Sequence, residues 1–125
     1  MASVKSKKEF ENHLHDIFSS VYHQMGCFDG WNIRLDYSYK KDSDNMESHA
    51  QCETRWEYQD ALIVCYPKNL RNKSKKEIEQ VMTHELIHVC LNEMWDWEPT
   101  EKGQKHEERV CQMLTRAFLN VSKKV

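Results

Sequence analysis

Residues that interrupt regular structure are scarce in this sequence, whose 125 residues include only three glycines and two prolines. This scarcity argues against a loop-rich chain and favours helices and strands joined by short connections. Long apolar runs are also lacking. No segment approaches the roughly 20 apolar residues that a membrane span needs, and the N-terminus has no apolar signal-peptide core. We therefore expect a soluble, cytoplasmic protein without a membrane partner.

An excess of charge of one sign is missing as well. The 18 lysines and arginines nearly balance the 20 aspartates and glutamates, which leaves a net charge of −2. This balance argues against nucleic acid as a partner, because phosphate binding usually requires a basic surface. The five cysteines are an odd number and form no CxxC pair. We therefore predict free thiols rather than disulfides or a cysteine-based zinc ribbon.

The length predicts one domain, residues 1–125, with a single hydrophobic core. Hydrophobic periodicity of 3.6 or 2 residues along the chain predicts an α+β fold in the order αβββαα. The predicted elements are a helix over 7–25, strands over 31–39, 52–58 and 61–66, and helices over 75–94 and 104–121.

Local signals predict how these elements begin and connect. Ser6 with Glu9, and Ser74 with Glu77, have the spacing of capping boxes at the starts of the first two helices. Gln59-Asp60 predicts a tight hairpin turn between the last two strands. The connection before the last helix is expected over 95–103. The apolar face of that helix is predicted to consist of Val110, Cys111, Leu114, Ala117 and Phe118.

One motif points to chemistry, the sequence His84-Glu85-Leu86-Ile87-His88 inside the predicted helix over 75–94. Residues four apart share a helix face, about 5–6 Å apart at Cβ, so both histidines can point to one ion. Zinc accepts such nitrogen ligands, and a catalytic site leaves one position to water. Glu85 follows the first histidine directly and can reach that water as a general base. The motif therefore predicts a zinc site with a hydrolytic function.

A third protein ligand is needed, and three consecutive residues compete for this role: His106, Glu107 and Glu108. Helical spacing places Glu107 on the apolar face with Cys111, and His106 on a neighbouring apolar face. Glu108 shares a polar face with Gln112, which predicts a solvated acid. We therefore rank Glu107 first and His106 second.

With these residues the chain resembles a minimal gluzincin. It is similar to the small HExxH proteins of phage and mobile-element genomes and to SprT-like and thermolysin-type peptidases. The resemblance implies a three-stranded sheet packed on the HExxH helix. It also implies Zn²⁺ held by His84, His88 and a glutamate of the following helix, with Glu85 as the base. Glu108 stands at the thermolysin-like distance from His88, which competes with the facing argument for Glu107.

The predicted function is a zinc metallopeptidase that hydrolyses peptide bonds of a peptide or protein substrate through a zinc-activated water. The alternative is a catalytically inactive protein of the same fold, whose zinc is structural and whose surface binds a protein or DNA. A structural site would fill the fourth position with protein, for which His106 is available beside Glu107. Candidate donors to the oxyanion are Tyr58, Tyr66 and His106. A peptide substrate is expected along the edge strand nearest the metal.

Overall fold

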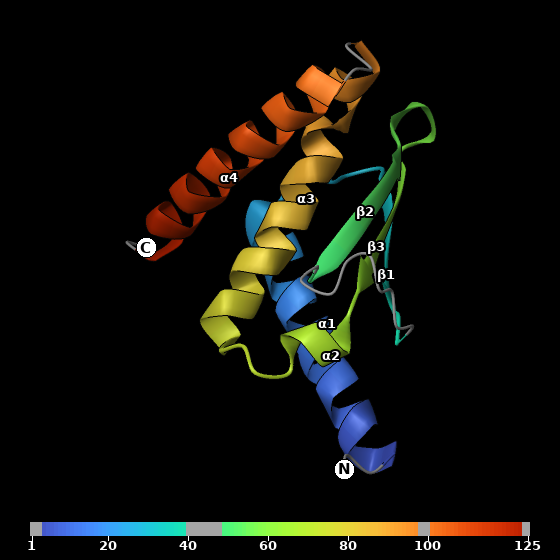
Figure 1. Cartoon of the computed structure of the whole chain (residues 1–125), viewed down its shortest axis with the longest axis vertical. Helices are drawn as coiled ribbons and strands as arrows, with labels where there is room; N and C mark the ends of the chain where they lie inside the picture. Colours follow the sequence, from blue (N-terminus) through green and yellow to red (C-terminus); the bar gives the residue numbers. More distant parts are fainter. Residues whose placement is uncertain (1–3, 40–48, 98–100, 124–125) are drawn as a thin grey trace.

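The computed structural model describes residues 4–39, 49–97 and 101–123 and has an α+β fold (Figure 1). The predicted αβββαα order is confirmed, with a four-residue helix added after the last strand. Proline suits the start of that added helix because its missing N–H would have no partner there. In chain order the elements are α1 (Val4–Met25), β1 (Asn32–Tyr37), β2 (Ala50–Arg55), the 3-10 helix η1 (Trp56–Tyr58), β3 (Asp60–Cys65), α2 (Pro67–Leu70), α3 (Lys75–Trp97) and α4 (Glu101–Lys123).

The three strands form one mixed sheet in the order β1-β3-β2. β3 lies in the centre, parallel to β1 and antiparallel to β2. Residues of β1 alternate between exposed and half-buried, as predicted for a strand with one covered face. In β3 the inward side chains of Ala61, Ile63 and Cys65 are fully buried. Because the strand order is β1-β3-β2, β2 forms an edge of the sheet within the described residues.

The second strand ends earlier than predicted. Residues 56–58 form η1, and Gln59 follows with a left-handed backbone (φ 51°). The Gln59 carbonyl accepts the N–H of Asn32 at 2.8 Å, which ties this turn to the start of β1. The predicted two-residue turn is wrong, because the favoured hairpin turns need positive φ at one or both central positions and the sequence offers no glycine there. A 3-10 helix followed by one left-handed residue makes the connection instead, and Asp60 already belongs to β3.

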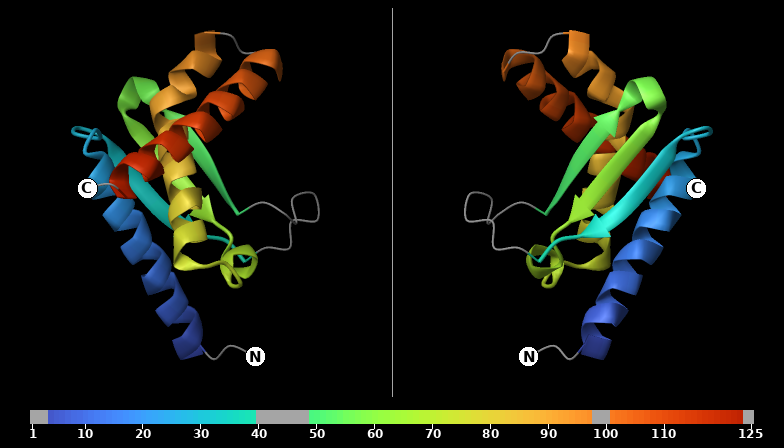
Figure 2. Two further views of the ribbon diagram at one scale, coloured as in Figure 1. Left: turned by 90° about the vertical axis from the view of Figure 1, so that its left-hand side faces the viewer. Right: turned by 90° about the vertical axis from the view of Figure 1, so that its right-hand side faces the viewer.

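The hydrophobic core lies between α1, α3 and one face of the sheet. Figure 2 shows α3 and α4 on the same side of the sheet. The fully buried core side chains include Leu14 and Val21 of α1, Ile63 of β3, and Met82 and Leu86 of α3. The HExxH helix is thus anchored by its apolar side, which leaves another side of α3 for α4. None of the helices in the described ranges combines the length and the apolar character that crossing a membrane requires.

The start of α3 confirms one of the two predicted capping boxes. The Ser74 N–H donates to Glu77 Oε1 at 3.0 Å, and the Glu77 N–H donates to Ser74 Oγ at 3.2 Å. These reciprocal bonds satisfy two backbone donors that a helix start leaves unpaired. The other prediction is wrong, because α1 begins before Ser6, which lies inside the helix rather than at its cap.

The helices around the predicted connection over 95–103 are longer than expected. α3 continues to Trp97 and α4 begins at Glu101, so most of that segment is helical. Gly103 remains inside α4, since one glycine in a helix costs only about 1 kcal/mol. The two helices therefore follow each other closely in the chain and pack against each other in opposite directions, crossing at an angle (Figures 1 and 2).

The buried face of α4 differs from the predicted apolar face. Glu107, Cys111 and Thr115 are buried, whereas Leu114 is 43% exposed and Met113 60% exposed. These three buried residues are spaced by four, which defines a narrow line along the helix. The line is narrow because α4 packs mainly on the single helix α3. A polar and small face of α4, rather than its most apolar face, thus lies against the HExxH helix.

Candidate metal centre

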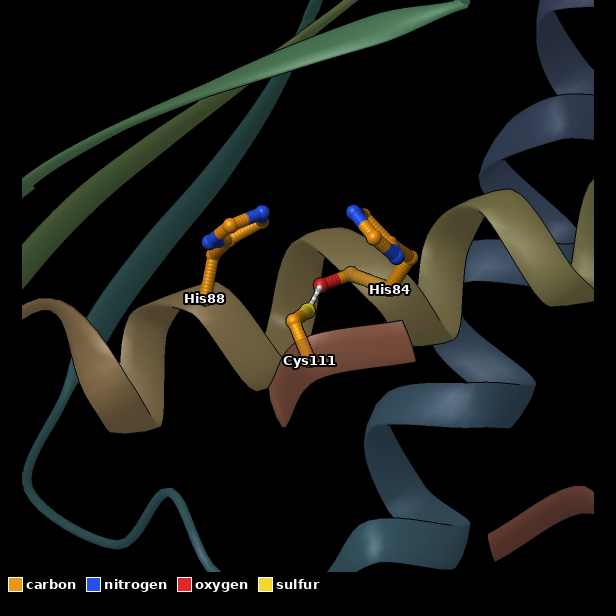
Figure 3. Close-up of side chains that lie close together, drawn as sticks. All are labelled: His84, His88 and Cys111. Carbon is orange, nitrogen blue, oxygen red and sulfur yellow. Dashed lines mark hydrogen bonds between the residues drawn. The ribbon is translucent and has the colours of Figure 1, made fainter. Parts of the chain in front are cut away.

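The two motif histidines lie one turn apart on the same side of α3. Their ring centroids are 4.8 Å apart, and the rings meet at 76°. Figure 3 shows both rings projecting from one side of α3, with Cys111 reaching the helix between them. His88 is buried, while 23% of the His84 side chain remains accessible. The pair therefore offers two imidazoles to a single ion, as the motif predicts.

The docking of α4 on α3 is held by Cys111. Its thiol donates a hydrogen bond to the backbone carbonyl of His84 at 2.9 Å. One turn further, the Thr115 hydroxyl donates to the carbonyl of Cys111 at 2.7 Å. Because this contact fixes α4 directly at His84, the residues one turn before Cys111 lie beside His88. Those residues are Glu107 and Glu108.

Glu108 faces the outer nitrogens of both histidines. Its Oε1 lies 2.6 Å from His88 Nε2, and its Oε2 lies 3.5 Å from His84 Nε2. Ligand atoms about 2.0–2.1 Å from one tetrahedral zinc lie roughly 3.3 Å from each other. The separation from His84, 3.5 Å, is close to this value, whereas the 2.6 Å separation from His88 is that of a direct ion pair. Half of the Glu108 side chain is nevertheless exposed (51%), as its predicted polar face requires.

Glu107 contacts the other ring nitrogen of His88, Nδ1. It is buried, which confirms its predicted inward facing. Its Oε2 accepts a hydrogen bond from His88 Nδ1 at 3.0 Å. The second oxygen, Oε1, is buried and has no hydrogen-bond partner within the described part of the chain. Since an unpartnered buried carboxylate oxygen is costly, this position suits a further cation or donor group.

Cys111 forms a second candidate donor set with the histidines. The ligand atoms of His84, His88 and Cys111 lie within 4.8 Å of one another, so these three residues can hold a metal ion after a modest movement. Only the thiolate binds a metal well. Burial, followed by the charge of Glu108, raises the pKa of the Cys111 thiol. The thiol proton is also engaged with the carbonyl of His84.

Glu85 follows His84 directly and lines the same groove as the histidines. Its side chain is buried, and burial, with a smaller contribution from Glu108, raises its pKa to about 8. Burial and the neighbouring His88 lower the pKa of His84, which favours the neutral imidazole that a metal requires. A carboxylate with a pKa near neutrality is suited to accept and return protons.

These residues line a groove of about 930 Å³ that runs along α3 between β2 and α4. β2 contributes Ala50, Gln51 and Cys52 to its wall, so the edge strand borders the candidate metal site. The lining from α3 and α4 consists of Glu77, Gln80, Val81, His84, Glu85, His88, Glu107, Glu108, Gln112, Thr115 and Arg116. This volume lies within the usual range of ligand-binding clefts in proteins.

Two of the residues predicted to assist, Tyr58 and Tyr66, are not brought to this groove. Tyr58 is 77% exposed in η1, and Tyr66 precedes α2; neither lines the groove. The side chain of His106 lies outside the described residues. Cys111 was not predicted as a donor, because its position in the sequence predicts a core residue. Arg116 was not predicted either, although the spacing of Glu108, Gln112 and Arg116 by four places all three on one face of α4.

Comparisons of the chain with protein-family models, with curated proteins and with solved structures find no match. The resemblance to gluzincins therefore rests on the motif and on the order of the elements. The geometry by itself supports a candidate metal site on α3, with histidine donors one turn apart and further donors from α4.

Proposed function

We propose that this chain is a zinc-dependent peptidase whose ion is held by His84, His88 and Glu108. The observation that carries this proposal is the position of the Glu108 carboxylate, which faces Nε2 of both histidines. Two imidazoles and one carboxylate are a ligand set of catalytic zinc sites, in which the fourth position is left to solvent. Glu108 is thus proposed as the third ligand in place of Glu107, the residue that helical facing favours.

Glu107 is proposed to orient His88 rather than to bind the ion. Its carboxylate holds a proton on His88 Nδ1, which leaves the lone pair of Nε2 free to bind a metal. Histidine ligands commonly donate their other N–H to a carboxylate in this way. The opposite placement of the two glutamates on the ring supports this division of roles.

Glu85 is the proposed general base. When bound, zinc supplies a water molecule with a pKa of about 7 and polarises the substrate carbonyl. Glu85 follows a ligand directly, lines the same groove and has a pKa raised to about 8. In its carboxylate form it can take a proton from that water and pass it to the leaving amine.

A peptide substrate is proposed to lie in the groove along β2. Within the described residues β2 pairs with a strand on one side only, so its other edge offers backbone N–H and C=O groups. An extended peptide can add to such an edge as a further strand. The groove lining from β2 and the neighbouring histidines would bring the peptide backbone next to the metal site.

The peptidase activity is tested with a proteome-derived peptide library whose cleavage products are read by mass spectrometry. Zinc-loaded wild type should cleave the library, and chelation of the metal should stop cleavage. Glu85→Gln should keep one zinc per chain and lose about 100-fold or more of the activity, because it lacks a base. Glu79→Gln, on the same helix but outside the groove lining, should remain active. If the Glu85→Gln chain retains its zinc and cleaves at the wild-type rate, Glu85 is not the base.

The second candidate function is a structural zinc site, favoured by the position of Cys111. Together with His84, His88 and Glu108, the Cys111 thiolate would provide four protein ligands and close the site to water. The ion would then join α3 to α4 without catalysis. In that case zinc-loaded wild type should show no cleavage of the library, and Cys111→Ser should weaken zinc binding as strongly as His88→Ala.

A further inference from the structure

The groove continues beyond the proposed zinc ligands towards the start of α3, and its character changes there. Apolar side chains contribute little to its lining, apart from Ala50, Val81 and Cys52. Two cations, Lys73 and Arg116, belong to the lining instead. Neither forms a salt bridge with a described residue. This end of the groove therefore offers two positively charged side chains to a ligand.

The position of Arg116 follows from the antiparallel packing of α3 and α4. Glu107 lies beside His88, and Cys111 lies beside His84, so four residues forward on α4 correspond to four residues back on α3. Thr115 is therefore opposite Gln80, and Arg116 follows it directly on α4; all three line the groove. The side chain of Arg116 is directed towards the N-terminal end of α4, as in any helix, and hence towards the metal site.

Lys73 lies at the far end of the same groove, just before α3. Its charge acts on two neighbours, His49 and Glu77. Glu77 is engaged in the capping box with the N–H of Ser74, so its carboxylate is fixed at the helix start. The cationic end of the groove is thus bounded by Lys73, His49 and Arg116, with Glu77 as the acidic neighbour.

We infer that this end of the groove binds a carboxylate of the peptide substrate; the inference rests on the proposed peptidase function and deepens it. Gln80 and Glu77 lie four and seven residues before His84, about 6–10 Å along the helix axis. An extended peptide covers this distance with two to three residues. The carboxylate therefore belongs to a residue two or three positions from the scissile bond.

The direction of the peptide decides on which side of the bond this residue stands. β2 runs from Ala50, which borders the groove, towards Arg55. A peptide paired antiparallel to β2 places its C-terminal part at the His49 end of the strand. The carboxylate is then either an Asp or Glu side chain on the C-terminal side of the bond, or the free C-terminus of a short peptide.

The test compares matched peptides derived from a site that the wild type cleaves in the library. In each pair, Asp or Glu at the second or third position after the bond is replaced by Asn or Gln. A further pair carries a free or an amidated C-terminus. We expect at least a tenfold preference in kcat/KM for one type of carboxylate. Arg116→Ala should reduce this preference to below about threefold, and Arg116→Glu with Lys73→Glu should reverse it in favour of Lys. Arg109→Ala, a loss of charge on α4 outside the groove lining, should leave the preference unchanged.

A binding measurement keeps this inference separate from the peptidase proposal. The peptide library is passed over immobilised Glu85→Gln protein, with and without Arg116→Ala. Retention of acidic peptides that depends on Arg116 supports the carboxylate site even if no cleavage is found. Cleavage by the wild type with equal rates for the Asp and Asn peptides, and for the free and amidated ends, overturns the inference while the peptidase function stands.

Discussion

Two adjacent glutamates on α4 illustrate how a single residue's direction determines its chemistry. Successive residues of a helix point about 100° apart. Glu107 points into the contact between α3 and α4 and meets Nδ1 of His88, whereas Glu108 points along the groove and meets both Nε2 atoms. The two carboxylates can therefore act on the same histidine from opposite sides. One would orient the ring and the other would share the ion.

Single substitutions should distinguish these roles through zinc affinity, measured by competition with a chromophoric chelator. Glu108→Ala removes a direct ligand and should weaken zinc binding by well over 100-fold. Glu107→Ala removes an orienting carboxylate and should cost about 10–100-fold. Cys111→Ser should change affinity little, since the hydroxyl can still donate to the carbonyl of His84.

Gln112→Ala is the matched control, because Gln112 lines the same groove one turn from Glu108 and carries no charge. Its zinc affinity should equal that of the wild type. Retention of zinc by Glu108→Ala together with its loss from Glu107→Ala would reverse the assignment and restore the third ligand favoured by helical facing. Circular dichroism of each variant excludes loss of the helices as the cause.

At the level of elements, the capped start of α3 determines where the HExxH motif lies along this helix. Ser74 and Glu77 cap this helix, and three turns later His84 and His88 project into the groove. The hydrogen bonds and the charge of Lys73 lower the pKa of Glu77. The charged form of Glu77 is thus favoured in the folded protein, and the cap weakens as the pH falls and Glu77 is protonated.

Ser74→Ala should lower the free energy of unfolding by about 0.5–2 kcal/mol, the usual effect of losing an N-cap side chain. Chemical denaturation at pH 7 measures the change. Because the folded-state pKa of Glu77 is lowered, its charge stabilises the fold at pH values above the ordinary pKa of a glutamate. This stabilisation is lost as the pH falls through the folded-state pKa. The difference between Ser74→Ala and wild type should therefore shrink when the measurement is repeated at pH 3–4. Ser20→Ala, at an exposed position in the middle of α1, should not destabilise the protein; an equal loss there would show that the cap is unimportant.

For the molecule as a whole, the ion would join two helices that are otherwise connected by a narrow contact. α4 packs mainly on α3, and its buried line consists of only Glu107, Cys111 and Thr115 in the described part of the helix. A metal bound by His84, His88 and Glu108 would bridge these two helices. Its binding energy would then contribute directly to the stability of the fold.

Removal of zinc should therefore lower the melting temperature. At free zinc 100 times above Kd, binding stabilises the folded state by about 2.7 kcal/mol, which corresponds to a shift on the order of 10 °C for a chain of this size. Differential scanning calorimetry with zinc and with a chelator measures the shift. His84→Ala should melt at the same temperature in both conditions. A wild type whose melting temperature is indifferent to zinc would contradict a site between α3 and α4.

The sequence by itself determined the order of the elements, because hydrophobic periodicity and the Ser74–Glu77 spacing are local properties of the chain. It also determined that His84 and His88 share a face, since a helix places residues four apart on one side. The boundaries around 95–103 and the turn at Gln59 were beyond local signals, because tertiary packing decides how far a helix extends.

Only the tertiary structure decided which residues of α4 meet the histidines. Helical facing ranks residues by their apolar neighbours, and it therefore favoured the side of Leu114, which remains 43% exposed. The contact of Cys111 with the carbonyl of His84 rotates α4 so that a polar line faces α3. The rotation of α4 depends on how its surface fits that of α3, between residues such as Cys111 and His84 that lie 27 positions apart. It places Glu108 and Arg116 in the groove; their spacing within α4 shows that they share a face, but not that this face lies beside the histidines.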